Sequence, residues 1–390
     1  MTERLDAPWM HREDIAELVA ALGEGNARFV GGAVRDTRLG LPVKDIDMAT
    51  VLLPDEVIAR LKEAGIRNVP TGIDHGTVTA VLPGGPVEIT TLRHDVSTDG
   101  RRATIAFAND WQEDAARRDF TINALYADPK SGQIFDYFGG KADLAGRHVR
   151  FIGDARQRIR EDHLRILRYF RFQARFGSQP ADTEAESACS DLAATLKGLS
   201  RERVGMETMN LLGLPDPAPT VRRMAELGVL EVILPEADPQ ALADLVACEQ
   251  AQGACPDALR RLAALLPAQV PLAEQVASRF RLSGAQKKRL AAAAARDGEP
   301  GDPHALAYRL GIDSALDRML IAGADIAPLE GWDIPVFPLK GGRIVARGVG
   351  AGPEVARILH RVEDRWIAEG FPDEARVEAL LDAELESRSA

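Results

Sequence analysis

The chain reads Phe-Val-Gly-Gly-Ala-Val-Arg-Asp at residues 29–36, an apolar run that stops at two glycines. Glycine has no side chain, so the backbone N–H groups of Gly31 and Gly32 can approach an anion closely, and the guanidinium of Arg35 can bind the same anion. A pair of glycines alone is usually only a turn. The arginine that follows here favours a phosphate-binding turn after a buried strand.

Two carboxylates follow this turn closely. The chain reads Lys-Asp-Ile-Asp-Met-Ala-Thr at residues 44–50. Because side chains alternate between the faces of a strand, Asp45 and Asp47 would lie on one face, opposite Ile46 and Met48. Taken alone, such a pair is usually a solvated strand edge. Beside a phosphate-binding turn, it predicts that Asp45 and Asp47 bind Mg²⁺, which joins them to a triphosphate.

Length and charge set the broad class. A chain of 390 residues exceeds one ordinary core, so two or more domains are expected. It has no run of 18 apolar residues and no signal-peptide pattern at its N-terminus, which predicts a cytoplasmic protein without a membrane span. The net charge of −11 argues against a nucleic-acid partner. However, nine arginines between residues 147 and 175 accompany only three acidic residues, and we expect a nucleotide or RNA there.

The order Gly-Gly-x-Val-Arg-Asp and then Asp-x-Asp resembles the signature of the class II CCA-adding tRNA nucleotidyltransferase and poly(A) polymerase family, within the DNA polymerase β superfamily. Residues 87–93, Val-Glu-Ile-Thr-Thr-Leu-Arg, are similar to the strand that carries the third catalytic carboxylate of this family, which implies that role for Glu88. Alternation places Glu88 away from the apolar side of this strand. The alternative is an ordinary exposed glutamate.

A second motif of the family lies at residues 117–123. The chain reads Arg-Arg-Asp-Phe-Thr-Ile-Asn there. A helix start alone would explain Asp119 but not the whole run. In the family this motif contacts the ribose and phosphates of the incoming nucleotide, so the resemblance implies nucleotide-binding roles for Arg118, Asp119 and Asn123.

The arginine-rich stretch predicts one helix from Ile159 to Phe176. Polar residues recur there every three positions, at Asp162, Arg165, Arg168 and Arg171. A carboxylate accepts hydrogen bonds and a guanidinium donates them, so Asp162 and Arg165 can match the base edges of both ATP and CTP. The alternative is a solvated face of intrahelical ion pairs such as Glu161 with Arg165. That alternative accounts poorly for Arg168 and Arg171, which we expect to lack acidic partners nearby and to bind the nucleotide. In the family, Glu-Asp-x-x-Arg at this place acts as the template.

Two flanking stretches complete the resemblance. Residues 94–113 are polar and poorly periodic, with Asp99-Gly100-Arg101-Arg102 as the expected loop tip, and we predict a mobile segment that governs the change from C to A addition. Residues 199–204, Leu-Ser-Arg-Glu-Arg-Val, resemble a helix that supports the nucleotide-binding helix.

These observations predict an α+β fold in which a polymerase β-like nucleotidyltransferase head with a mixed β-sheet precedes an all-α neck, body and tail. The predicted domains are the catalytic head (residues 1–145), a helical neck that recognises the nucleotide base (146–215), a helical body (216–330) and a helical, RNA-binding tail (331–390). The resemblance implies template-independent addition of CCA to the 3′ end of tRNA from CTP and ATP, with release of pyrophosphate and Mg²⁺ as cofactor. A poly(A) polymerase, or an enzyme that adds only A or only CC, is the alternative within the family. A non-catalytic RNA-binding scaffold is the alternative outside it, and the sequence does not indicate an oligomeric state.

Overall fold

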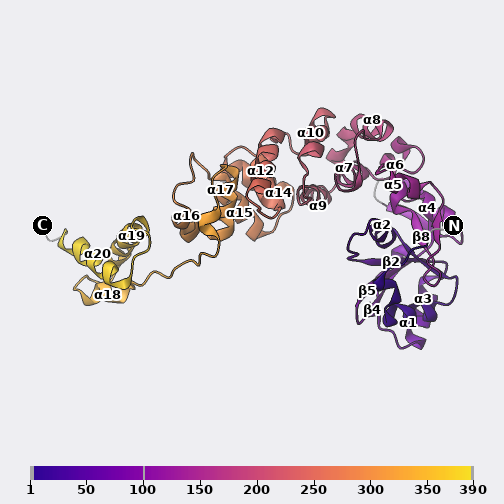
Figure 1. The fold of residues 1–390 in the computed structure, drawn as a ribbon, viewed down its shortest axis with the longest axis horizontal. Helices are drawn as coiled ribbons and strands as arrows, with labels where there is room; N and C mark the ends of the chain where they lie inside the picture. The colour runs from indigo at the N-terminus through magenta and orange to yellow at the C-terminus, as the bar shows by residue number, and fades with distance from the viewer. Residues whose placement is uncertain (1–3, 100–101, 388–390) are drawn as a thin grey trace. The chain divides into compact units, whose positions relative to one another are not determined.

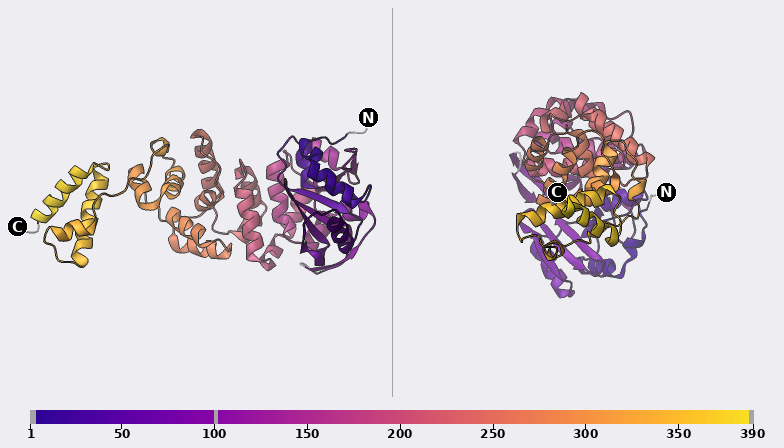
Figure 2. Two further views of the ribbon diagram at one scale, coloured as in Figure 1. Left: turned by 90° about the horizontal axis from the view of Figure 1, so that it is seen from below. Right: turned by 90° about the vertical axis from the view of Figure 1, so that its left-hand side faces the viewer.

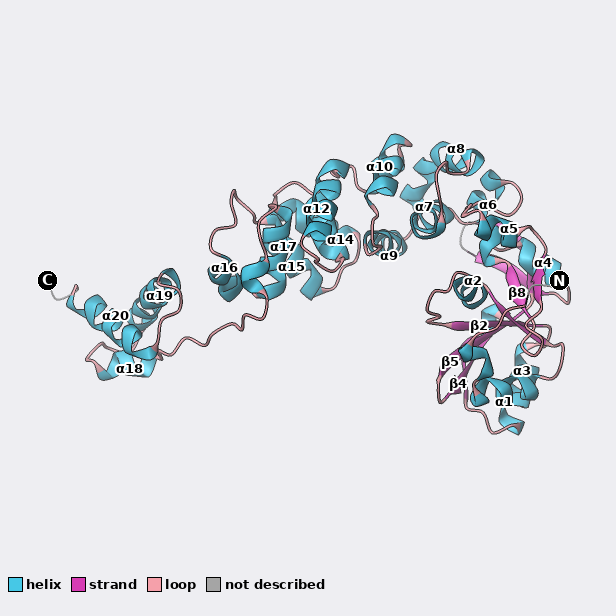
Figure 3. Cartoon of the chain, viewed as in Figure 1, coloured by secondary structure: helices cyan, strands magenta, loops and turns pink. Residues whose placement is uncertain are grey.

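A computed structural model describes residues 4–99 and 102–387 of the chain. The chain divides into two compact units, residues 1–235 and 236–390. In the described residues every strand lies before residue 137, and the regular elements after it are helical (Figure 3). The predicted α+β head followed by all-helical parts is therefore confirmed. The finer division into four domains stays a prediction.

A mixed sheet forms the core of the head. In the described part of the chain seven strands join in the order β3-β4-β5-β2-β1-β8-β9, and β2 pairs in parallel with β5 while the other neighbours are antiparallel. The strands are β1 (Ala27–Val30), β2 (Ile46–Thr50), β3 (Asn68–Gly72), β4 (Thr77–Leu82), β5 (Gly85–Thr91), β8 (Leu125–Ala127) and β9 (Ile134–Asp136).

Alternation along the two central strands separates an apolar face from a polar one. Met48 of β2 lies opposite Phe29 of β1 and Ile89 of β5, and all three are fully buried. The helices α1 (Glu13–Leu22) and α3 (Pro54–Glu63) pack on each other and on β4 (Figures 1 and 2). Asp47 and Glu88, which alternate with these apolar residues, therefore lie on the other face of the sheet.

The segment 94–113 differs from its prediction. It forms a hairpin of β6 (Arg93–Asp99) and β7 (Arg102–Phe107), followed by the helix α4 (Trp111–Ala116). The prediction of an irregular loop is wrong for these strands, because a glycine between two runs that contain β-branched residues is a local signal of a hairpin. Gly100 and Arg101, at the expected tip, lie outside the described residues.

The predicted helix 159–176 is two helices, α6 (Ala155–Glu161) and α7 (Arg165–Phe176). Asp162 has an extended backbone, with φ −149° and ψ 105°, and its carboxylate accepts a hydrogen bond from the Leu164 N–H at 3.1 Å. Aspartate favours such local bonds over a helix interior, which is why the helix breaks here. The prediction of a single helix is therefore wrong. The three-residue spacing of polar side chains along one helix does not include Asp162, which lies between the two helices.

Helices complete the first unit. The short helices α2 (Gly32–Arg38) and α5 (Gly140–Ala145) belong to the head. After α7 come α8 (Thr183–Asp191), α9 (Arg201–Leu212), α10 (Ala218–Glu226) and α11 (Val229–Ile233). Short 3₁₀ turns lie at Pro8–His11, Ile73–His75, Thr121–Asn123 and Ala193–Gly198.

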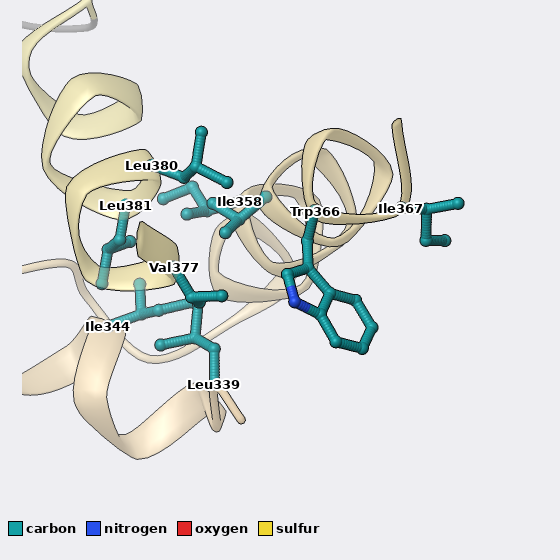
Figure 4. Packing of buried hydrophobic residues seen from close by; sticks show 9 residues of the cluster. Leu339, Ile344, Ile358, Trp366, Ile367, Val377, Leu380 and Leu381 are labelled. Atoms are coloured by element: carbon teal, nitrogen blue, oxygen red, sulfur yellow. The ribbon is translucent and has the colours of Figure 1, made fainter. Parts of the chain in front are cut away.

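In the second unit, all the regular elements that the structure describes are helices. Its helices are α12 (Pro239–Ala251), α13 (Ala258–Leu265), α14 (Val270–Arg279), α15 (Gly284–Ala294), α16 (Pro303–Leu310), α17 (Ile312–Ile321), α18 (Gly341–Ala346), α19 (Pro353–Ala368) and α20 (Glu374–Glu386), with a 3₁₀ turn at Ala327–Leu329. Trp366 and Ile358 of α19 are buried with Leu381 of α20 and Ile344 of α18 in one apolar cluster (Figure 4). Among the helices that the structure describes, none combines the length and apolar character needed to cross a membrane.

Candidate active site

The glycine turn connects β1 to α2. Gly31 has a φ of +67°, a backbone conformation that residues with a side chain rarely adopt. A Cβ built on Gly31 would lie 3.7 Å from both Arg118 Nη1 and the Asn123 carbonyl oxygen. Glycine is therefore favoured here by the backbone conformation, because both neighbours are at ordinary van der Waals distance, and its N–H donates to the Leu125 carbonyl oxygen at 3.2 Å. The turn and the second family motif, which are almost 90 residues apart in the sequence, meet at this point.

Arg35 lies inside the fold. It is 6% exposed, its Nε donates to Asp36 Oδ1 at 2.8 Å, and its Nη1 donates to Asn123 Oδ1 at 2.5 Å. Its guanidinium also lies 4.2 Å from the centre of the Phe176 ring of α7. In this arrangement Arg35 joins the glycine turn to the second motif and to α7, and direct contact with an anion stays a prediction.

The predicted carboxylates lie beside this turn. Asp47 and Glu88 are directly opposite each other on the parallel strands β2 and β5, and Asp45 immediately precedes β2. Burial, the nearby charge of Glu88 and, to a smaller extent, that of Asp45 raise the pKa of Asp47 to about 6, although the positive charge of Arg118 opposes this shift. The structure therefore brings the three carboxylates and Arg118 within electrostatic reach of one another.

These residues suit a divalent cation that shares its ligands with a substrate. In the part of the chain that the structure describes, no group of three or more His, Cys, Asp or Glu side chains is close enough to hold a metal by itself. Mg²⁺ is commonly bound by one or two carboxylates together with substrate phosphates and waters. Such a cation would offset the repulsion of Asp47 by the negative charges of Glu88 and Asp45.

Arg118 is held by a buried acid that the sequence analysis missed. Asp114 of α4 accepts hydrogen bonds from Arg117 Nε at 2.8 Å, from Arg118 Nη2 at 3.1 Å and from the Tyr126 hydroxyl at 2.7 Å. Burial alone would raise the pKa of Asp114, but the charges of Arg118 and Arg117 and the Tyr126 hydrogen bond lower it to about 2. The signal was available, because Asp114 precedes the two arginines by three and four residues, the spacing of neighbours on a helix.

Asp119 joins the second motif to α7. Arg168 donates to Asp119 Oδ2 through Nε at 2.8 Å and Nη2 at 2.5 Å, while Asn123 Nδ2 donates to Asp119 Oδ1 at 3.0 Å. Burial would raise the pKa of Asp119, but the Arg168 charge and these hydrogen bonds lower it to about 2. The expectation that Arg168 lacks an acidic partner is therefore wrong, because that partner lies 49 residues earlier in the chain.

Arg171 is also paired, which corrects the same expectation for that residue. Its Nε donates to Glu207 Oε2 of α9 at 2.6 Å, and Glu207 is 3% exposed. The helix that resembles the supporting motif of the family therefore does pack beside α7. Four more of the nine arginines between residues 147 and 175 also form ion pairs, namely Arg150 with Asp143, Arg156 with Asp191, Arg158 with Glu161, and Arg175 with Asp36. The local excess of arginine in the sequence thus overstates the free positive charge.

The two residues expected to recognise the base lie at the break between α6 and α7. Asp162 Oδ2 accepts from Arg203 Nη2 of α9 at 2.7 Å. Arg165 Nη1 donates to Glu161 Oε2 at 2.6 Å and to the Arg158 carbonyl at 2.8 Å, as the ion-pair alternative predicts, and its Nη2 donates to the Arg117 carbonyl at 3.0 Å. Both side chains are held by neighbouring segments, and base recognition by them stays a prediction.

Comparison with known proteins agrees with this geometry. The model of the poly A polymerase head domain matches residues 27–150, and the model described as "Probable RNA and SrmB- binding site of polymerase A" matches residues 182–240. The mitochondrial CCA tRNA nucleotidyltransferase 1 of Mus musculus is 34% identical over 366 residues, which cover 88% of this chain and 83% of the mouse protein. The chain belongs to the CCA tRNA nucleotidyltransferase family.

Further members of this family support the assignment along the whole chain. The human mitochondrial CCA tRNA nucleotidyltransferase 1 is 35% identical over the same length, with the same coverage. The crystal structure of the Bacillus stearothermophilus CCA-adding enzyme in complex with CTP superposes with a TM-score of 0.75 at 26% identity, covering 98% of this chain and 99% of that one. The family resemblance inferred from the sequence motifs is thus confirmed, and the helical parts share it.

Proposed function

We propose that this protein completes the 3′ end of tRNA by adding CCA from CTP and ATP without a nucleic-acid template, with release of pyrophosphate. The observation that carries the proposal is the meeting of the Gly31 turn, Arg118 and the opposed carboxylates Asp47 and Glu88 in a head that matches CCA tRNA nucleotidyltransferases. A triphosphate bound there would have the Gly32 amide and the Arg118 guanidinium on one side, and carboxylates on the other.

Asp45 and Asp47 are the residues that would hold Mg²⁺, which in nucleotidyl transfer activates the attacking hydroxyl and stabilises charge on the α-phosphate. The Gly32 amide and the Arg118 guanidinium bind the triphosphate, whereas the Gly31 N–H donates to the Leu125 carbonyl oxygen at 3.2 Å and shapes the turn. Glu88, opposite Asp47, supplies the third carboxylate of the polar face. No side chain needs to act as a nucleophile, because the 3′-hydroxyl of the RNA attacks the α-phosphate directly.

The second motif and α7 orient the sugar. Asp119 and Asn123 are hydrogen-bonded to each other, and Arg168 fixes the Asp119 carboxylate. In the proposal this group contacts the ribose, and Arg171 supports it through Glu207. Positioning of this kind contributes much of the rate enhancement of phosphoryl transfer.

Base selection falls to Asp162 and Arg165. Cytosine and adenine each present an exocyclic amino group beside a ring-nitrogen acceptor, which a carboxylate and a guanidinium match. Uracil and guanine present a carbonyl and a ring N–H instead, so both contacts would be lost. For Asp162 and Arg165 to bind the base, they must give up part of their present hydrogen bonds to Arg203 and to the backbone carbonyls.

The cytoplasm is the proposed compartment. The mouse and human relatives are named as mitochondrial proteins, so fractionation of cells that express this chain, followed by immunoblotting of the cytoplasmic and organellar fractions, tests this part of the proposal.

The activity is tested with tRNA transcripts that end before, within and after CCA, each given one nucleoside triphosphate with Mg²⁺, with sequencing of the product ends. We expect C to be added twice to the shortest transcript, A once after CC, and nothing after CCA. Long A tails would indicate a poly(A) polymerase, and addition of only A or only CC would indicate a partial enzyme of the family. Binding without any addition would indicate the non-catalytic scaffold.

A further inference from the structure

The triphosphate-binding arginine of the proposed site is anchored from behind by Asp114. Asp114 is 1% exposed. Its Oδ2 accepts hydrogen bonds from Arg118 and Tyr126, and its Oδ1 accepts one from Arg117. A buried carboxylate with several charge-assisted bonds has one well-defined position, and so do the groups that it holds.

The hydrogen bonds of Arg118 leave one particular nitrogen for a ligand. Nη2 donates to Asp114 at 3.1 Å, and Nε donates to the Tyr126 hydroxyl at 3.1 Å. Nη1 is the atom that approaches the glycine turn, because a Cβ built on Gly31 would lie 3.7 Å from it. The two anchoring bonds therefore set the direction in which the third nitrogen points.

We propose that Asp114 is a positioning residue that, together with Tyr126, holds Arg118 with Nη1 towards a triphosphate bound at the Gly31 turn. The inference rests on the proposed function, which places the triphosphate there. Asp114 does not touch the nucleotide and acts only through Arg118.

The same carboxylate joins the hairpin to this arginine. Asp114 Oδ1 also accepts from the backbone N–H of Arg93, the first residue of β6, at 3.4 Å. The base of the β6–β7 hairpin and the triphosphate-binding arginine thus share one anchor.

The first test replaces Asp114 with asparagine. Asp114→Asn offers one acceptor oxygen in place of two and carries no charge, so it cannot hold Arg118, Tyr126 and Arg117 together, and Arg118 loses its fixed direction. We expect kcat/KM to fall about 10- to 100-fold, and equally for CTP and ATP, because the phosphates are common to both. Tyr126→Phe removes only the hydroxyl of a fully buried ring. This variant should also lower kcat/KM, but less than Asp114→Asn does.

A double-mutant cycle separates positioning from general destabilisation. If Asp114 acts only through Arg118, Asp114→Asn in an Arg118→Ala background should change kcat/KM by less than about twofold. Glu249→Gln is the matched control, since Glu249 is also 1% exposed and pairs with Arg260 and Arg261 in the second unit. This variant should lower the melting temperature but not kcat/KM. All rates are measured well below the lowest melting temperature.

Nucleotide binding tests the inference without any tRNA. By calorimetry, Asp114→Asn should weaken binding of CTP about tenfold and leave binding of CMP unchanged, because only the triphosphate reaches Arg118. Unchanged CTP affinity in both Asp114→Asn and Tyr126→Phe would overturn the inference, as would effects that simply add in the Arg118→Ala background. A wild-type protein that binds CTP but extends no tRNA would refute the proposed function instead, and the comparison of CTP with CMP would still decide the role of Asp114.

Discussion

Replacing Asp47 with asparagine should make the free protein more stable while abolishing its activity. The pKa of Asp47 is raised from 3.8 to about 6, chiefly by burial and by Glu88. A carboxyl group with a raised pKa in the folded state contributes stability below pH 4, and this contribution is lost as the pH rises through about 6. At pH 8 the ionised Asp47 therefore destabilises the metal-free fold, and asparagine removes that charge at nearly constant shape.

The magnitude follows from the shift. A difference of about 2 pH units corresponds to about 3 kcal/mol, which is an upper limit because water reaches part of this side chain. We expect a gain of about 1 to 2 kcal/mol, equivalent to roughly 2 to 8 °C in melting temperature for a unit of this size. At pH 4, where Asp47 is protonated in the fold, the gain should almost vanish.

The assay is thermal unfolding of wild type and Asp47→Asn in EDTA at pH 8 and pH 4. Glu17→Gln, which neutralises an exposed carboxylate of α1, serves as the control and should change little. Adding Mg²⁺ with CTP at pH 8 should raise the melting temperature of wild type more than that of the variant. The reasoning is refuted if Asp47→Asn melts no higher than wild type at pH 8, or gains as much at pH 4.

Three further predictions concern other parts of the site. Replacing residues 97–104 with a short glycine turn should yield tRNA that ends in CC, with C addition retained; normal CCA ends, or equal loss of both additions, would refute a role of the hairpin in the change to A. The double variant Asp162→Ala with Arg165→Ala should lose about two to four decades of discrimination between CTP and UTP, measured as single-nucleotide addition. Arg171→Ala removes the close partner of the buried Glu207 and should lower the unfolding free energy by about 3 kcal/mol in urea titration, whereas Arg171→Ala with Glu207→Gln should recover part of the loss.

Features that depend on local pattern could be predicted from the sequence. The turn after β1 follows from the glycine pair, and the separation of Asp47 from the apolar Ile46 and Met48 follows from the period-two alternation of β2. These signals need only neighbouring residues. The glycine between the sequences of the two hairpin strands and the helical spacing of Asp114 ahead of its arginines are equally local signals.

Features that depend on distant partners could not be predicted. Arg168 has no acidic residue nearby in the sequence, yet it binds Asp119, which the fold brings to it from 49 positions away. The break at Asp162 is stabilised in part by Arg203, 41 residues later. The periodicity of a sequence segment shows which of its residues share a face of a helix or strand. Ion pairs between segments depend on tertiary packing, which this periodicity does not show.

The most direct test of the central claim is the 3′-end sequence of a tRNA transcript without CCA after incubation with CTP, ATP and Mg²⁺. Wild type should convert the ends to CCA and stop, and Asp47→Ala should leave them unextended while remaining folded by circular dichroism. Ends that grow into long A tails would contradict CCA addition. Extension by Asp47→Ala at a rate near that of wild type would contradict the assignment of the catalytic carboxylates.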